Sequence, residues 1–183
     1  MLVTARDRIK FCRACAAPVA YRVPAEDNRE RAVCTRCETV WYENPVNVVG
    51  TVPVWGDQVL LCKRAIEPRH GFWTLPAGFL ELGESTAQGA LRETDEEAGA
   101  VVELGPLFSV LDVVRVGQLH LFYLATMRSP ELNPGSETLE ARLFREDEVP
   151  WDAIAFRTVR ETLQFFFDDR RRGVFAVHQA EIG

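Results

Sequence analysis

Two pairs of cysteines near the N-terminus constrain the fold of this 183-residue chain more than any other feature. They are Cys12-x-x-Cys15 and Cys34-x-x-Cys37, with 18 residues between the pairs. Each CxxC pair can wrap a tight turn around one metal ion, and two such turns supply four thiolates in a tetrahedral array. The polar segment between the pairs cannot form a core by itself, so metal binding would supply its folding free energy. The spacing therefore predicts a structural Zn²⁺ site; the alternative is four incidental thiols or redox pairs.

The fifth cysteine, Cys62, lies in the apolar run VLLC and is predicted to be a small buried hydrophobe. An odd number of cysteines in a reducing compartment argues against a disulfide framework. The basic N-terminus is not followed by the apolar run of a signal peptide, and no stretch approaches the ~18 apolar residues of a membrane span. We therefore expect a cytoplasmic protein with no membrane partner.

The charge balance bears on the class of partner. The chain has 27 acidic and 21 basic side chains, and its formal net charge is −6. This balance argues against a nucleic-acid partner held by phosphate contacts, and RNA decapping in particular fits it poorly. It does not exclude a small phosphorylated substrate, because a metal ion can supply the positive charge.

From residue 46 onward, strand-like and helix-like segments follow one another. Apolar, β-branched or alternating runs predict strands at 46–55, 58–64, 101–104, 107–116, 118–127 and 141–144. Apolar side chains at helical spacing predict a helix at 156–172. A second helix is predicted at 85–98, with Gly99 as the residue that ends it. Mixed strands with two helices indicate an α+β or α/β sandwich. We place a zinc ribbon at residues 1–42 and a second domain at 43–183.

The first of these helices gathers acidic residues near its C-terminal end. Glu93, Glu96 and Glu97 stand at i, i+3 and i+4 and share one face. Carboxylates in the last turn oppose the helix dipole by roughly 0.3–1 kcal/mol each, and like-charged pairs at this spacing cost roughly 0.2–0.5 kcal/mol. A solvated acidic face is the alternative, but a divalent cation among the carboxylates explains the cost. Oxygen-only ligands favour Mg²⁺ first and Mn²⁺ second.

The spacing around this helix resembles the Nudix box, G-x5-E-x7-R-E-U-x-E-E-x-G-U, where U is an apolar residue. Every fixed position of that motif is matched, by Gly78, Glu84, Arg92, Glu93, Glu96, Glu97 and Gly99. Thr94 departs from the motif at a position that is usually aliphatic. The resemblance implies an α/β/α sandwich around a mixed sheet, and hydrolysis of a nucleoside diphosphate linked to another moiety.

The resemblance also assigns roles to individual residues. Glu93, Glu96 and Glu97 would be metal ligands, and one of them would also orient or deprotonate the attacking water. Glu84 and Arg92 would brace the loop and helix through charge-assisted hydrogen bonds. Gly78 would let its backbone approach the metal closely. A further acidic ligand or base is expected from a later loop, for which Glu137 and Glu140 are the candidates and Glu140 is our choice as a magnesium ligand.

Beyond the motif, the ribbon is joined through WYENPVNVVG to CKRAIEPRHGFWTLPAGFLELGES. This arrangement resembles a zinc-ribbon Nudix subgroup that includes plant FAD and ADP-ribose pyrophosphatases. It implies Mg²⁺-dependent cleavage of FAD or ADP-ribose to AMP plus FMN or ribose 5-phosphate, and by analogy a homodimer. NADH pyrophosphatases also have a ribbon, but their SQPWPFPxS-type array has no counterpart at residues 109–127. The alternatives are therefore an NADH or other dinucleotide pyrophosphatase, and a nucleotide-sensing module that docks through its ribbon.

Candidate substrate contacts lie between the second predicted strand and the motif. Arg64 and Arg69 could hold phosphates, because an acidic site needs cationic counterparts. Phe72 and Trp73 could stack on a base or a flavin ring. The alternatives are a core position for Trp73 and a strand-end surface position for Arg64.

Overall fold

The computed structural model describes residues 9–183. The chain divides into two compact units that adjoin in sequence between Pro45 and Val46. Sequence patterning placed this boundary after residue 42. Among residues 9–183, no helix is both long enough and apolar enough to cross a membrane.

The N-terminal unit is a small three-stranded antiparallel sheet in the order β1-β2-β3. Its strands are β1 (Val19–Arg22), β2 (Arg31–Cys34) and β3 (Val40–Trp41). The buried residues at its centre are Cys12, Ala17 and Cys34, with few other apolar side chains against them. A core this small cannot offset the entropy cost of ordering the chain, and a metal ion held by the cysteines would supply the missing stability.

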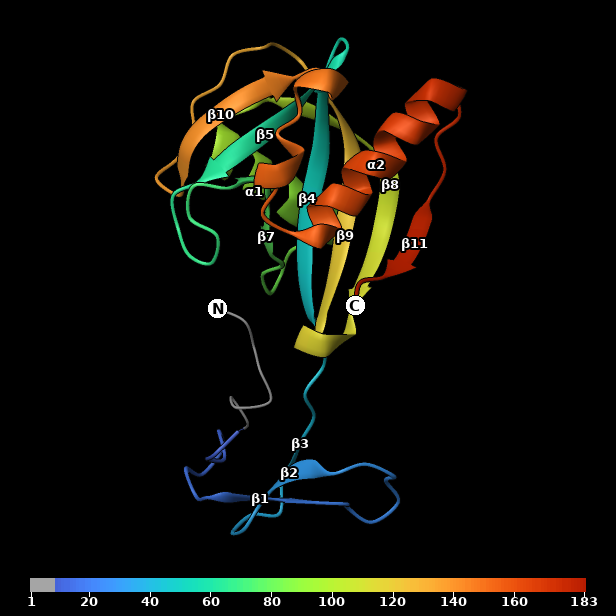
Figure 1. The fold of residues 1–183 in the computed structure, drawn as a ribbon. Coiled ribbons are helices and arrows are strands. Elements are labelled where there is room, and N and C mark those ends of the chain that lie inside the picture. The colour runs from blue at the N-terminus through green and yellow to red at the C-terminus, as the bar shows by residue number, and fades with distance from the viewer. Residues whose placement is uncertain (1–8) are drawn as a thin grey trace. The chain divides into compact units, whose positions relative to one another are not determined.

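The second unit is built on one mixed sheet in the order β10-β5-β4-β9-β8-β11, with β6 paired to β5 and β7 paired to β4 (Figure 1). The strands are β4 (Val46–Trp55), β5 (Gln58–Arg64), β6 (Trp73–Thr74), β7 (Ala77–Phe79), β8 (Val102–Val113), β9 (Gln118–Met127), β10 (Thr138–Phe144) and β11 (His178–Glu181). Two pairs, β4 with β9 and β8 with β11, are parallel, and the other neighbours along the path are antiparallel.

The helices α1 (Thr86–Ala98) and α2 (Arg157–Arg172) cover opposite faces of this sheet. Strand β5 shows this, because its successive side chains point to opposite faces. Val59 and Leu61 pack in the cluster that contains Leu163 of α2. Leu60 and Cys62 pack in the cluster that contains Ala98 of α1. The predicted α/β sandwich with a mixed sheet is therefore confirmed, and Cys62 is buried as expected.

Three short 3₁₀ helices complete the second unit, at η1 (Val114–Val116), η2 (Glu146–Glu148) and η3 (Trp151–Ala153). The predicted strands 101–104 and 107–116 are one long strand, β8, which ends at η1. Strand β11 was not predicted from sequence. It is held at the sheet edge by pairing with β8, by a 2.7 Å contact between His178 Nε2 and Asp169 Oδ2, and by the stacking of Phe165 on the His178 ring.

Candidate active site

Residues at both ends of helix α1 stop it from extending further in either direction. The side chain of Ser85 accepts a hydrogen bond from the backbone N–H of Gln88, while the Gln88 side chain accepts from the N–H of Ser85. This capping box satisfies two of the free donors at the helix N-terminus. Gly99 ends the helix with a left-handed φ of 59°, which costs glycine no steric strain. The acidic face is thereby placed in the last two turns.

Two glycines, one in α1 and one in β7, allow close packing around this helix. A Cβ added at Gly89 would lie 2.8 Å from Cγ2 of Val49, so glycine there lets α1 approach β4. A Cβ added at Gly78 would lie 2.4 Å from the carboxylate atoms of Glu93. The missing side chain at Gly78 therefore leaves the space in which the Glu93 carboxylate lies.

Arg92 ties the loop before α1 to the acidic face. Its guanidinium makes two hydrogen bonds to Glu84, at 2.7 and 3.0 Å, which lower the pKa of that carboxyl to about 2. Nη1 of Arg92 also donates to Glu93 at 2.7 Å and to Glu96 at 3.1 Å, and Nη2 donates to the carbonyl of Phe79 at 3.1 Å. The guanidinium of Arg92 thus holds together three carboxylates and the carbonyl of the last residue of β7.

Glu97 is the most deeply buried of the three carboxyls on the acidic face of α1. It is 8% exposed, and its Oε2 accepts a hydrogen bond from the backbone N–H of Ala77 at 3.0 Å. Burial raises the pKa of Glu97 to about 8, with further increases from the charges of Glu93 and Glu137. Burial also raises the pKa of Glu93, against the opposing effect of Arg92. Two partly desolvated neighbouring carboxyls are a site where a cation would be strongly favoured.

The raised pKa of Glu97 predicts that the metal-free protein loses stability as the pH rises. The unfolded chain releases this proton near the ordinary value of 4.5, whereas the folded chain keeps it until about pH 8. Because the folded state binds more protons in this window, the free energy of unfolding falls across it, by a few kcal/mol. Denaturant unfolding with chelator, from about pH 5 to about pH 9, measures the fall. Glu97→Gln should flatten it; an unchanged slope in that variant would assign the effect to other groups.

The structure distinguishes the two candidates for a further acidic residue. Glu137 is exposed, on the loop before β10, and its charge raises the pKa values of both Glu93 and Glu97. Glu140 is exposed on β10, opposite Lys63 in the strand register. Glu137 is therefore the candidate whose charge acts on the acidic cluster, while Glu140, our choice from sequence, stands opposite Lys63 in the register of β10 and β5.

The predicted substrate contacts have different environments. Arg64 lies close enough to Glu97 for its charge to lower the pKa of that carboxyl, and its guanidinium lies 5.1 Å from the ring of Phe156. Arg69 lies 5.5 Å from the ring of Phe72. Trp73 is 8% exposed and meets Phe144 edge-on at 4.9 Å between ring centroids. Core packing accounts for Trp73, and its burial does not support a stacking role.

Sequence reasoning missed two groups that act on this site. The backbone N–H of Ala77 holds Glu97, and Thr51 on β4 lies against Thr94 of α1. No sequence signal could have found the first, because a backbone donor does not depend on residue type. The second required knowing which strand packs beneath the helix.

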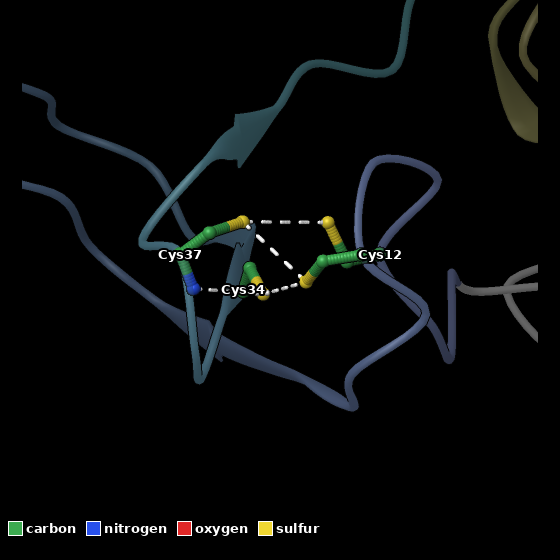
Figure 2. A group of neighbouring side chains, drawn as sticks. Cys12, Cys34 and Cys37 are labelled. Atoms are coloured by element: carbon green, nitrogen blue, oxygen red, sulfur yellow. Dashed lines mark hydrogen bonds between the residues drawn. The ribbon is translucent and has the colours of Figure 1, made fainter.

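The cysteine cluster of the N-terminal unit fits a tetrahedral ion. The Sγ atoms of Cys12, Cys15, Cys34 and Cys37 all lie within 4.8 Å of one another. Within residues 9–183, no other group of three or more His, Cys, Asp or Glu side chains brings its ligand atoms together in this way. Sulfur–sulfur distances of 3.4, 3.6 and 3.7 Å are close to the ~3.8 Å expected around Zn²⁺ with ~2.3 Å bonds. Figure 2 shows the side chains of Cys12, Cys34 and Cys37 converging, and the backbone N–H groups of Arg36 and Cys37 donate to Cys34 Sγ.

Comparison with known proteins agrees with both halves of this description. The family model described as Nudix N-terminal, a zinc ribbon, matches residues 10–43, and the NUDIX domain model matches residues 44–164. A crystal structure of a NUDIX hydrolase from Nitrosomonas europaea is 44% identical, covers 95% of this chain and 99% of its own, and superposes with a TM-score of 0.92. The fold and the acidic helix thus define a Nudix protein. The chain belongs to the NUDIX family and includes its N-terminal zinc ribbon.

Two curated relatives have more specific names. An NAD-capped RNA hydrolase, NudC, from Photobacterium profundum is 30% identical over 84% of this chain. An ADP-ribose pyrophosphatase from Methanocaldococcus jannaschii is 27% identical over 60% of this chain and 67% of its own length. This chain spans 58% of the length of the NudC relative.

Proposed function

We propose that this chain is a divalent-cation-dependent pyrophosphatase that cleaves the phosphoanhydride of a dinucleotide-type substrate. The observation that carries the proposal is the buried carboxyl of Glu97, held by Ala77 and set beside Glu93 on one helix face. A buried acid whose pKa is raised by burial and a like-charged neighbour is typical of a functional site. These side chains offer only oxygen ligands, which suit Mg²⁺ or Mn²⁺.

Glu93, Glu96 and Glu97 would hold the cation, which when bound neutralises phosphate charge and polarises phosphorus. Arg92 would then keep its two bonds to Glu84, so that the loop before α1 stays fixed while Glu93 and Glu96 turn to the ion. We assign Glu137 to orient the attacking water and accept its proton, because it is exposed and electrostatically close to Glu93 and Glu97. Water attack on one phosphorus breaks the P–O–P link and leaves two phosphate monoesters.

The names of two relatives support the proposed substrate class. One is named for ADP-ribose and the other for NAD-capped RNA, and both substrates contain a pyrophosphate between two ribose-linked groups. We propose ADP-ribose or FAD as substrate, with AMP and either ribose 5-phosphate or FMN as products. The second candidate is the NAD group of NADH or of a capped RNA, which the name of the NudC relative favours. A capped-RNA substrate, unlike NADH, would require RNA to bind despite the net charge of −6.

A substrate panel tests the proposal. With Mg²⁺, we expect AMP release from ADP-ribose or FAD at kcat/KM of at least ~10⁴ M⁻¹s⁻¹, slower cleavage of nucleoside triphosphates, and no turnover after removal of divalent cations. NADH and an NAD-capped oligonucleotide belong in the same panel. Preference for the capped RNA would select the second candidate, and no turnover of any member would refute the hydrolase.

Two further expectations from sequence stay predictions. They are a cytoplasmic location and assembly as a homodimer. The boundary of the ribbon at residue 42 and the substrate roles of Arg64 and Arg69 likewise await experiment. Separate Arg64→Ala and Arg69→Ala variants in the same panel address those roles, because loss of a phosphate contact should raise KM.

A further inference from the structure

Two buried threonines join helix α1 to the sheet directly beside the acidic cluster. Thr94 follows Glu93 on α1, and Thr51 lies on β4; neither side chain has exposed surface. Their hydroxyl oxygens are 2.6 Å apart. Thr94 occupies the motif position at which an aliphatic residue is usual. In this chain a hydrogen bond joins helix and strand at that position.

The direction of this hydrogen bond follows from counting protons. Thr94 Oγ1 also donates to the carbonyl oxygen of Ala90, one turn earlier in the helix, at 2.7 Å. A hydroxyl has a single proton, so Thr94 can only accept in its bond with Thr51. The chain therefore runs from Thr51 to Thr94 to the carbonyl of Ala90. Each bond polarises the next in the same direction, and both lie in a fully buried environment.

We propose that Thr51 and Thr94 are positioning residues that set the rotation of α1 about its own axis. That rotation decides where the carboxylates of Glu93 and Glu97 point. An apolar contact is non-directional and tolerates rolling, whereas a short hydrogen bond restricts both distance and angle. The inference rests on the proposed function, because the orientation matters only if these carboxylates bind a cation.

The geometry of a helix shows why a small rotation is important. A carboxylate lies roughly 6 Å from the helix axis, so a roll of about 10° displaces it by about 1 Å. A misplacement of that size at a catalytic group can cost on the order of 10²-fold in rate. At the other end of α1, Thr86 Oγ1 lies 2.6 Å from the hydroxyl of Tyr123 on β9. The helix is thus held by a hydroxyl pair at each end, and the pair at Thr94 is the one beside the cluster.

The direction of the bond predicts unequal effects of single substitutions on stability. Thr94→Val leaves the Thr51 hydroxyl buried without its acceptor. Thr51→Val leaves the Thr94 proton on the Ala90 carbonyl, so every remaining donor is satisfied. We expect Thr94→Val to unfold at the lower temperature. The double variant, with two apolar side chains of the same shape, should recover most of the lost stability, because no buried hydroxyl remains.

The deciding measurement is the affinity of the full zinc-loaded chain for Mn²⁺. The electron paramagnetic resonance signal of free Mn²⁺ reports how much of the ion is bound. We expect the double Thr51→Val/Thr94→Val variant to recover its melting temperature but to bind Mn²⁺ about tenfold more weakly than the wild type. The Mg²⁺ concentration for half-maximal activity should rise by the same factor. A pair with a purely structural role would recover both properties together.

A matched hydroxyl pair on the other helix provides the control. Thr162 of α2 is fully buried and lies 3.0 Å from the hydroxyl of Ser109 on β8. Thr162→Val should lower the melting temperature and leave Mn²⁺ affinity at the wild-type value. If the double variant binds Mn²⁺ as tightly as the wild type, the positioning role is refuted while the proposed hydrolase stands. If the wild type itself binds no Mn²⁺, both fail.

Discussion

Glu97→Gln is expected to lower kcat/KM for ADP-ribose or FAD by about 10²- to 10³-fold while leaving the fold intact. Glutamine keeps the shape of the side chain and an oxygen that can still accept from the Ala77 N–H. It removes a carboxyl whose pKa is raised to about 8 by burial, so the metal-free variant should be at least as stable as the wild type above neutral pH. Activity and stability therefore move in opposite directions.

Asp95→Asn is the matched control for this experiment. Asp95 is exposed on the same helix and is not among the fixed positions of the motif. The control makes the same carboxyl-to-amide change on α1, so its kcat/KM should stay within a few-fold of the wild-type value. If Glu97→Gln retained wild-type turnover, Glu97 would not be a ligand of the catalytic ion. If the wild type bound the nucleotide without cleaving it, and Glu97→Gln kept that binding, the protein would be a nucleotide sensor.

Cys34→Ser is expected to abolish zinc binding and to unfold the N-terminal unit. Cys34 has no exposed surface and accepts hydrogen bonds from the backbone N–H groups of two neighbouring residues, so it lies at the centre of the ribbon. Structural Zn²⁺ contributes roughly 10–16 kcal/mol to the folding of zinc-finger peptides, more than the few apolar side chains here can replace. The second unit has its own extensive core and should remain folded.

Zinc content per chain and hydrogen exchange measure this outcome. We expect loss of bound zinc and fast exchange of the amides of β1, β2 and β3, with protection kept across β4, β5 and β9. Cys62→Ala is the control, because Cys62 is buried in the second unit, outside the cysteine cluster, and its replacement should leave zinc content unchanged. Retention of zinc and of amide protection in Cys34→Ser would contradict the structural role of the metal.

The parts of the fold that were predictable from sequence are those encoded locally. Helix α1 was predicted to begin one residue early and to end at Ala98, where Gly99 adopts the left-handed conformation that ends the helix. The capping box of Ser85 and Gln88, found in the structure, is an equally local signal. Strand β11 could not be predicted in this way. Its four residues, HQAE, have no apolar alternation, and contacts with β8, Asp169 and Phe165 hold them in place.

The candidate site also has features that were predictable from local sequence and features that depend on tertiary contacts. Sequence spacing alone placed Glu93, Glu96 and Glu97 on one helix face, since the 3.6-residue period is a property of the chain itself. From sequence we chose Glu140 over Glu137, whereas the electrostatics of the folded chain favour Glu137, because the outcome depends on how the loop before β10 lies against the end of α1. Burial likewise decided that Trp73 belongs to the core.

The amino-acid sequence by itself determined the four thiolates, the acidic helix face and the family to which the chain belongs, because each is a matter of residue type at short, regular spacing. Tertiary structure alone decided that Glu97 is desolvated against Ala77 and that Thr51 meets Thr94 at 2.6 Å. Those properties arise where strands and a helix distant in sequence pack together, and burial strengthens the electrostatic and hydrogen-bonding effects that local spacing cannot show.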